Sequence, residues 1–221
     1  MTDEVTPRFS AKKFHEQPGV EDWSVLFWGA YVHYVCDSLA HAVALVNAVA
    51  VIAERVGHSP DLDVRPEGVT IRTTTKRDGT LSLQDAALAR EIQVVARELG
   101  YRSDPSTLLV TGIAVAQGAD VDNRPFWAAV MGYEFLGDED AVDPQRRNPH
   151  TWFHELTPPR PGRGRTHIDI SVPAAFGEAR VNAALAHGGR IVEKHASHWT
   201  IASPDNHKID VAIWADSEDF A

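Results

Sequence analysis

The sequence is poor in cysteine, in basic residues and in long apolar runs, and each shortage excludes a class of protein. The single cysteine, Cys36, cannot form an intramolecular disulfide, so a disulfide-stapled scaffold is excluded and a reducing compartment is expected. Only 21 Lys and Arg oppose 31 Asp and Glu, and a net charge of −10 without a basic stripe argues against nucleic acid or an anionic membrane as partner. We find no signal-peptide pattern and no window that approaches the roughly 20 apolar residues of a membrane span. We therefore expect a cytoplasmic protein that binds a small molecule.

What is present is typical of a globular protein with two domains. The chain has 221 residues, of which 43% are hydrophobic and 24% charged, and this is long enough for two cores of about 100 residues each. The segment "YRSDPST", residues 101–107, is polar and contains a proline, which is typical of a linker. We predict domains at residues 1–103 and 104–221.

The first half predicts an α+β domain with an antiparallel sheet and the element order β-β-α-β-α. Aromatic and β-branched residues flank Gly29, which indicates a hairpin. Asp37 or Ser38 can cap the following helix, and Gly57 supplies its left-handed stop. We predict strands at 23–28, 31–35 and 68–75, and helices at 39–56 and 82–99.

A histidine, a serine and a proline follow directly after the first predicted helix. The proline, Pro60, fixes the chain direction, so His58 stands on a short rigid segment. With an unperturbed pKa of about 6.5, this histidine can give or take a proton at neutral pH. On spacing alone, an interaction with the last carbonyls of the helix is the favoured explanation of His58.

The longer run "AERVGHSPDLDVRPEGVTIRTTTKRDGTLSLQDAALAREI" resembles the pterin-4a-carbinolamine dehydratase family, over about residues 8–99. Glu54, His58, Pro60 and Asp85 occupy positions of the family's motif. The resemblance implies a hydro-lyase that converts a 4a-hydroxytetrahydropterin to a quinonoid dihydropterin and requires no cofactor. It also implies that His58 transfers protons and that Asp85 supports it.

The sequence departs from the family where the chemistry lies. Ser59 stands at the family's second histidine and Thr75 at its strand-end histidine. Together with Glu54 and Pro60 they are expected to contact the pterin, but hydroxyl groups cannot act as bases at neutral pH without an activator.

Dehydration needs one proton delivered to the departing hydroxyl and one removed from N5, so two acid–base groups are expected. Asp85 can be the second group, or, three residues after Ser82, it can serve only in a capping box. A pterin-binding module without turnover and a domain kept for assembly are the alternatives to a dehydratase.

The second half predicts a strand–helix–strands module that occurs twice, at about 108–156 and 165–214, as a weak internal repeat. The segments "NRPFWAAVMGYEF", "RGRTHIDISV" and "SPDNHKIDV" resemble the vicinal oxygen chelate superfamily, in particular its glyoxalase-like branch. The resemblance implies paired βαβββ modules around a shared cavity, in which many members hold a divalent metal on inward strand positions.

Matched residue by residue, the resemblance implies His154, His167 and Asp210 as metal ligands. The ligand position on the first strand falls near Gly112, which has no donor. Three ligands plus water would make an open catalytic site, but the two histidines can instead bind an organic ligand by hydrogen bonds. The corresponding activity would be that of a metal-assisted lyase, isomerase or dioxygenase.

Both families often self-associate, and exposed strand edges can pair between chains. We therefore expect a homodimer or a higher homo-oligomer, with a pterin-like small molecule as substrate.

Overall fold

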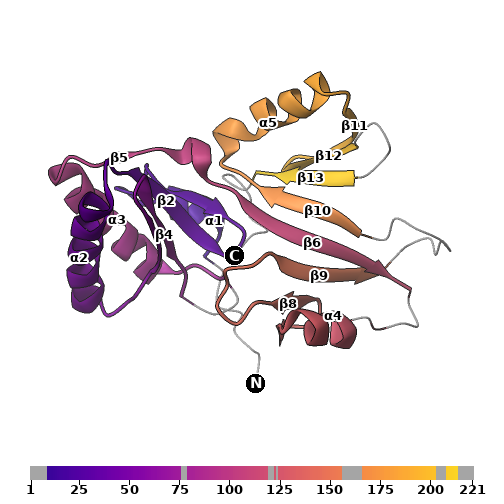
Figure 1. Ribbon diagram of the computed structural model, residues 1–221, viewed down its shortest axis with the longest axis horizontal. Coiled ribbons are helices and arrows are strands. Elements are labelled where there is room, and N and C mark those ends of the chain that lie inside the picture. Colours follow the sequence, from indigo (N-terminus) through magenta and orange to yellow (C-terminus); the bar gives the residue numbers. More distant parts are fainter. Residues whose placement is uncertain are drawn as a thin grey trace. The chain divides into compact units, whose positions relative to one another are not determined.

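The computed structural model describes residues 9–75, 79–118, 122, 124–155, 166–202 and 208–213. They form two compact units, and the boundary lies between Leu108 and Leu109. Each unit combines a sheet with helices (Figure 1). The boundary predicted after residue 103 falls at the end of the short strand β5 (Arg102–Ser103), and as a division between two functions it stays a prediction.

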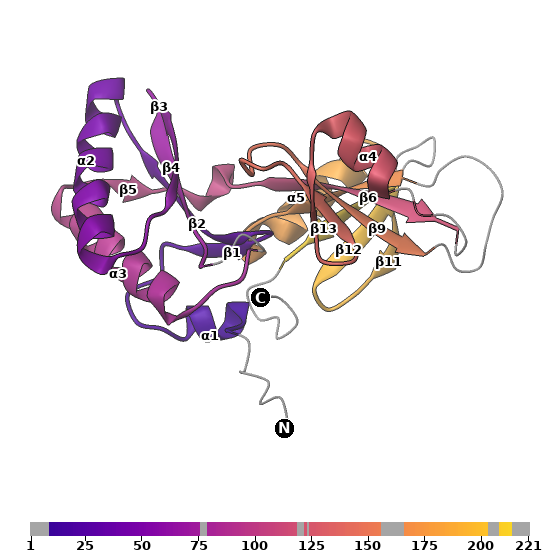
Figure 2. The same cartoon turned by 90° about the horizontal axis from the view of Figure 1, so that it is seen from below.

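The first unit is a five-stranded antiparallel sheet with two long helices on one face (Figure 2). The strands run in the order β1-β2-β4-β3, and β5 also pairs with β2. The elements are α1 (Ala11–His15), β1 (Ser24–Leu26), β2 (Gly29–Val35), α2 (Leu39–Val56), β3 (Asp61–Arg65), β4 (Gly68–Thr73), α3 (Leu83–Glu98), β5 and the 3-10 turn η1 (Pro105–Thr107).

Alternation along the central strands gives this sheet one apolar face. On β2, Ala30, Val32 and Tyr34 are fully buried, whereas the residues between them are partly exposed. Leu45 and Val49 of α2 are buried in the same core. Because burying a large aliphatic side chain contributes about 1.5–3 kcal/mol, this helix–sheet interface supplies the main stabilisation of the unit.

Both long helices begin and end as the sequence indicates. Ser38 caps α2, accepting a hydrogen bond from the backbone of His41, and Gly57 ends it with φ +70°, a conformation that glycine adopts at little cost. Ser82 caps α3 in a complete capping box with Asp85. The predicted helices and the α+β class are therefore confirmed.

Besides β5 and η1, which lie in the segment predicted as a linker, the short helix α1 and the edge strand β3 escaped prediction. In β3 the acidic residues Asp61 and Asp63 alternate with Leu62 and Val64, and the apolar pair packs against the core. Period-two alternation was thus present in the sequence, but over only five residues. Charged residues along β3 also blunt this edge of the sheet against pairing with another chain.

The outward side of α2 is unusually apolar. Leu39, Val43 and Val51 are 52%, 44% and 70% exposed, and no charged side chain lies between Leu39 and Ala53. We call these three residues the outer face of α2. By length and composition α2 is apolar enough to cross a membrane, with 28% of the stretch buried within the protein. The expectation that no window of the sequence approaches a membrane span is therefore wrong for α2, by length and composition.

The second unit is an eight-stranded sheet built from two copies of a β-α-β-β-β module, in the order β11-β12-β13-β10-β6-β9-β8-β7. Within each module the first strand pairs in parallel with the last, β6 with β9 and β10 with β13, and β6 and β10 pair antiparallel at the centre. The predicted paired βαβββ architecture is confirmed. The first module has β6 (Val110–Gln117), α4 (Arg124–Met131), β7 (Glu134–Leu136), β8 (Asp140–Val142) and β9 (His150–Glu155); the second has β10 (Thr166–Ser171), α5 (Ala174–Ala186), β11 (Arg190–Lys194), β12 (His198–Ala202) and β13 (Lys208–Ala212).

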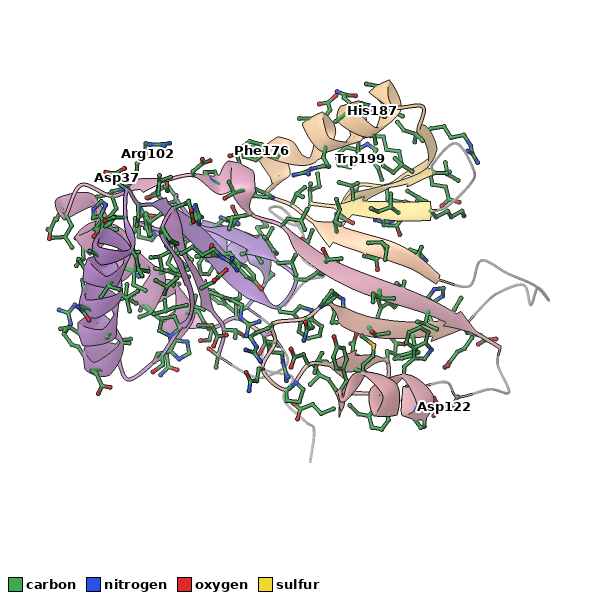
Figure 3. The ribbon with its side chains drawn as sticks, viewed as in Figure 1. Asp37, Arg102, Asp122, Phe176, His187 and Trp199 are labelled. Carbon is green, nitrogen blue, oxygen red and sulfur yellow. The ribbon has the colours of Figure 1, made fainter. Side chains whose placement is uncertain are left out.

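Helices α4 and α5 cover the apolar face of this second sheet. Val115 and Phe153 pack with residues of α4, and Ile170 packs with residues of α5. Trp199 of β12 lies under α5 (Figure 3), where Gly177 leaves room for its ring. Because successive side chains of a strand point to opposite faces, the residues between these apolar positions share the other face. We call it the polar face; it carries Gly112, Ala114, Ala116, His150, Trp152, His154, His167, Asp169, Ser171, Thr200 and Asp210.

Candidate active site and candidate metal centre

In the first unit, His58 stands between the end of α2 and the start of β3. Its backbone N–H donates to the carbonyl oxygen of Ala53 at 3.2 Å, as does that of Gly57 at 2.9 Å. The side chain, 12% exposed, is directed elsewhere, because Nε2 lies 2.8 Å from Oδ1 of Asp85. The helix end is therefore satisfied by the backbone of His58, and its imidazole pairs with a carboxylate.

Asp85 is fully buried, and its two carboxylate oxygens have different partners. Oδ1 pairs with His58 and accepts a hydrogen bond from Oγ1 of Thr73 at 2.6 Å. Oδ2 accepts from the backbone N–H and the hydroxyl of Ser82, both at 2.9 Å, and from the hydroxyl of Thr75. The capping role and the role beside His58, which the sequence left as alternatives, are compatible.

This arrangement favours one nitrogen of His58 for chemistry. Nε2 donates to a buried carboxylate, which fixes the tautomer and leaves Nδ1 as the nitrogen that can exchange a proton with a ligand. The oxygens of Asp85 are occupied by hydroxyls, a backbone N–H and the imidazole. Asp85 is therefore suited to orienting His58 rather than to removing a proton itself.

The structure brings together His58, Asp85 and Thr75 among the residues predicted from sequence. Glu54 and Ser59 are exposed and Pro60 is partly buried, and within the described part of the chain no hydrogen bond joins their side chains to the His58–Asp85 pair. Sequence reasoning missed two residues that complete the carboxylate's shell. They are Thr73, on the buried face of β4, and Ser82, noticed only as a cap.

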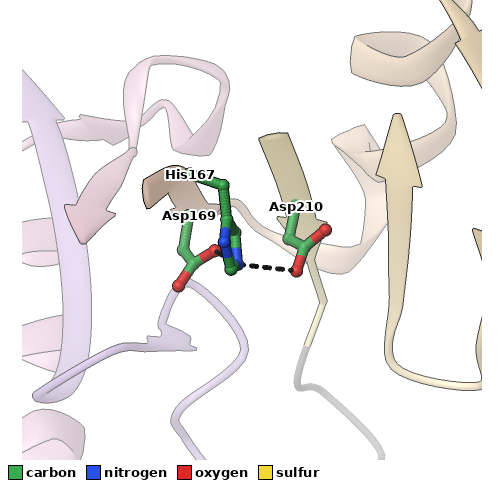
Figure 4. A group of neighbouring side chains, drawn as sticks. All are labelled: His167, Asp169 and Asp210. Carbon is green, nitrogen blue, oxygen red and sulfur yellow. Dashed lines mark ion pairs between the residues drawn. The ribbon is translucent and has the colours of Figure 1, made fainter. Parts of the chain in front are cut away.

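In the second unit, His167, Asp169 and Asp210 cluster on the polar face (Figure 4). His167 Nε2 lies 3.2 Å from Oδ1 of Asp169 and 3.5 Å from Oδ2 of Asp210. One ligand atom from each residue lies within 4.8 Å of the other two. We call these three residues the cation cluster.

The electrostatics of the cation cluster follow from two acids flanking one imidazole. Hydrogen bonds to Asp169 and then to Asp210 raise the pKa of His167 to about 9 against the cost of burial. Burial raises the pKa of Asp210, but hydrogen bonds from His167 and Thr200 outweigh it, so this pKa is lowered. At neutral pH the imidazole holds a proton, which a bound cation would replace.

The donor set fits a divalent cation. Oδ1 of Asp210 is buried and, within the described chain, has no hydrogen-bond partner, whereas Oδ1 of Asp169 faces the imidazole of His167 at 3.2 Å. Oδ2 of Asp169 accepts from Nε1 of Trp152, which fixes the carboxylate. Carboxylate oxygens and an imidazole converging from neighbouring strands suit Zn²⁺, Mn²⁺ or Fe²⁺.

Two of the three predicted metal ligands, His167 and Asp210, lie in the cation cluster. The third, His154, lies beside it: its ring stacks on Trp152 at 4.7 Å, and its centroid is 5.9 Å from that of His167. Asp169 takes the third place and was missed, although its spacing of two from His167 puts it on the same face of a strand.

Comparisons with known proteins divide the chain in the same way. Residues 6–95 match the family described as pterin 4 alpha carbinolamine dehydratase, and residues 114–212 match a glyoxalase-like domain.

Among curated relatives, a Nocardia farcinica protein is 46% identical over 61 residues, which are 28% of this chain and 64% of that protein. The chain thus spans slightly less than two thirds of this relative. A Chloroflexus aurantiacus protein is 34% identical over 90 residues, which are 40% of this chain and 97% of the relative. Both relatives are named provisionally as pterin-4-alpha-carbinolamine dehydratases. A solved glyoxalase/bleomycin resistance protein/dioxygenase superfamily member from Vibrio splendidus is 13% identical, with a TM-score of 0.32, and the match covers 48% of this chain and 99% of that one.

The raised pKa of His167 can be measured by NMR titration of the metal-free protein. We expect a pKa of about 9 for His167 in the wild type, well above the ordinary 6.5. Asp169→Asn should lower it by about one unit or more, and Asp210→Asn by less, because each removes one carboxylate partner. Asp63→Asn, in the first unit, is the matched control and should leave it unchanged. A wild-type value near 6.5 would show that the carboxylates do not hold this proton.

Proposed function

The chain belongs to the pterin-4a-carbinolamine dehydratase family through its first unit, and on this premise we propose that the unit dehydrates a 4a-hydroxytetrahydropterin, with His58 as the proton-transferring residue. The observation that carries the proposal is the 2.8 Å pair between Nε2 of His58 and the buried carboxylate of Asp85. In this role, Nδ1 of His58 takes the proton from N5 of the substrate and returns a proton to the hydroxyl at C4a. The hydroxyl leaves as water, and the quinonoid dihydropterin is the product.

The residues at two positions of the family motif lower the rate of dehydration that we expect. Ser59 and Thr75 replace histidines of the family pattern, and Thr75 donates its hydroxyl to Asp85 instead. One imidazole must then serve both proton transfers. Because a positioned general acid or base contributes about 10²–10⁴-fold, we propose a slower enzyme than one with a second imidazole. Ser59, Glu54, Pro60 and Thr75 remain our proposed pterin contacts.

For the second unit we propose binding of a divalent cation by the cation cluster, as the basis of a lyase, isomerase or dioxygenase-type activity. The buried Oδ1 of Asp210, which has no hydrogen-bond partner within the described chain, favours this function, since such atoms are rare in folded proteins. A bound cation would supply Lewis-acid activation of an oxygen-containing substrate. His167, Asp169 and Asp210 would hold it, and Trp152 would orient Asp169.

We further propose a cytoplasmic homo-oligomer. We propose the outer face of α2 as its contact surface. The strand edges, which the sequence suggested, are less suitable because the edge strand β3 carries charged side chains. An apolar helix face of this kind is stabilised by burial against a second copy.

The dehydratase proposal is tested by stopped-flow absorbance of 4a-carbinolamine dehydration in the presence of EDTA. Wild type should exceed the uncatalysed rate, and His58→Ala should lose about 10²-fold or more of the enhancement. His187→Ala, at the exposed end of α5, is the control and should match wild type. Ser59→His, which supplies a second imidazole, should raise the rate. Wild type and Ser59→His both at the uncatalysed rate would reject turnover and favour a pterin-binding or assembly module.

The cation proposal is tested by calorimetric titration of dialysed protein with Co²⁺. We expect one equivalent to bind the wild type, and Asp210→Asn to weaken binding by about 10-fold or more because one charged ligand is lost. His58→Ala should bind normally, since it lies in the other unit. A wild type that takes up neither Co²⁺, Mn²⁺ nor Zn²⁺ would reject the cation site.

The oligomer is tested by size-exclusion chromatography with light scattering. Val51→Glu places a charge on the most exposed large apolar residue of α2 and should dissociate the assembly. Val94→Glu, an exposed apolar position on α3, is the matched control and should leave the mass unchanged. A monomeric wild type would end this proposal.

A further inference from the structure

The imidazole of His150 fills the space above Gly112. Gly112 lies on β6, and His150 is its partner on the neighbouring strand β9. A Cβ added at Gly112 would stand 2.4 Å from Cε1 of His150 and 2.7 Å from Nε2, closer than any real Cβ contact. The ring thus lies over the backbone of β6 and can do so only because residue 112 has no side chain.

The same row of the sheet carries both carboxylates of the cation cluster. Gly112 is the register partner of Asp169 on β10, and Asp169 is that of Asp210 on β13. His150, Asp169 and Asp210 therefore follow one another along a line across the polar face, with Gly112 as the gap in that line. Neighbouring strands are about 4.8 Å apart, so a ring lying over Gly112 is brought toward Asp169. His150 also interacts electrostatically with Asp169.

We propose that His150 is a fourth protein ligand of the cation, supplied from β9 in place of a donor on β6. The inference rests on the cation site proposed above and completes it as two imidazoles and two carboxylates. The first central strand has no donor at Gly112, and the adjacent strand provides one that crosses over it. His150 is only 7% exposed, so the surrounding residues hold its ring in one place, as the ring of a metal ligand must be held.

The register distinguishes His150 from His154, the histidine that the sequence favoured. His154 is two residues further along β9 than Trp152 and pairs with Ala116, whereas the row of His167 passes through Ala114 and Trp152. His154 therefore lies on the far side of His167 from the two carboxylates. Its ring is also stacked on Trp152, whose position on β9 lies between His154 and the row of Asp169.

The test measures Co²⁺ affinity and the visible absorption of bound Co²⁺, which reports the number and type of ligands without requiring turnover. We expect His150→Gln to weaken binding by more than about 100-fold, beyond the effect typical of a group that only orients a ligand. The absorption should change as an imidazole is lost. His154→Gln, the matched control on the same strand and face, should retain both affinity and spectrum.

Gly112→Ala provides a second variant that removes no donor. Its added Cβ must displace the ring of His150, so Co²⁺ affinity should again fall. In a His150→Ala background, the same Gly112→Ala change should have no further effect, because no ring remains to be displaced. Thermal unfolding of each variant shows whether it is folded.

The outcomes separate the two proposals. If wild type binds no cation, the cation site itself is rejected. If wild type binds Co²⁺ and the folded His150→Gln and Gly112→Ala variants bind it equally well with an unchanged spectrum, the cation site stands and the role of His150 is rejected. Loss on His154→Gln instead of His150→Gln would assign the fourth ligand to His154.

Discussion

Buried carboxylate oxygens must find partners, and this requirement organises both units. An ionised carboxylate removed from water without partners costs several kcal/mol. In the first unit, Asp85 meets the requirement completely with hydroxyls, a backbone N–H and the imidazole of His58. The same bonds that begin α3 therefore also fix the orientation of His58, to which we assign the proton transfer.

In the second unit the requirement is met only in part. Asp169 and Asp210 share the imidazole of His167, and Asp210 keeps a buried oxygen without a hydrogen-bond partner in the described chain. A carboxylate whose oxygens all accept hydrogen bonds can orient a neighbouring side chain, whereas a carboxylate with an oxygen that lacks a partner can bind a ligand. The two units thus place the same residue types in different arrangements, for which we propose acid–base transfer in one and cation binding in the other.

Local sequence signals predicted the elements of the fold well. Ser38, Gly57 and Ser82 define helix ends through contacts within a few residues, so their positions could be read directly. The short strand β3 was missed because five residues carry too little periodicity, and its pairing with β4 decides it. The candidate sites divide in the same way: His58 and Asp85 follow from one motif, whereas Thr73 joins them only through the fold.

The sequence by itself determined the two-part α+β architecture, the helix boundaries and the identity of most candidate residues, because caps, turns and periodicity act over short distances along the chain. Only the tertiary structure decided which donors meet. The register of β9, β6, β10 and β13 replaces His154 by Asp169 in the cation cluster and brings His150 over Gly112. Strand register joins residues that are tens of positions apart, and a shift of one residue would turn each of them to the opposite face.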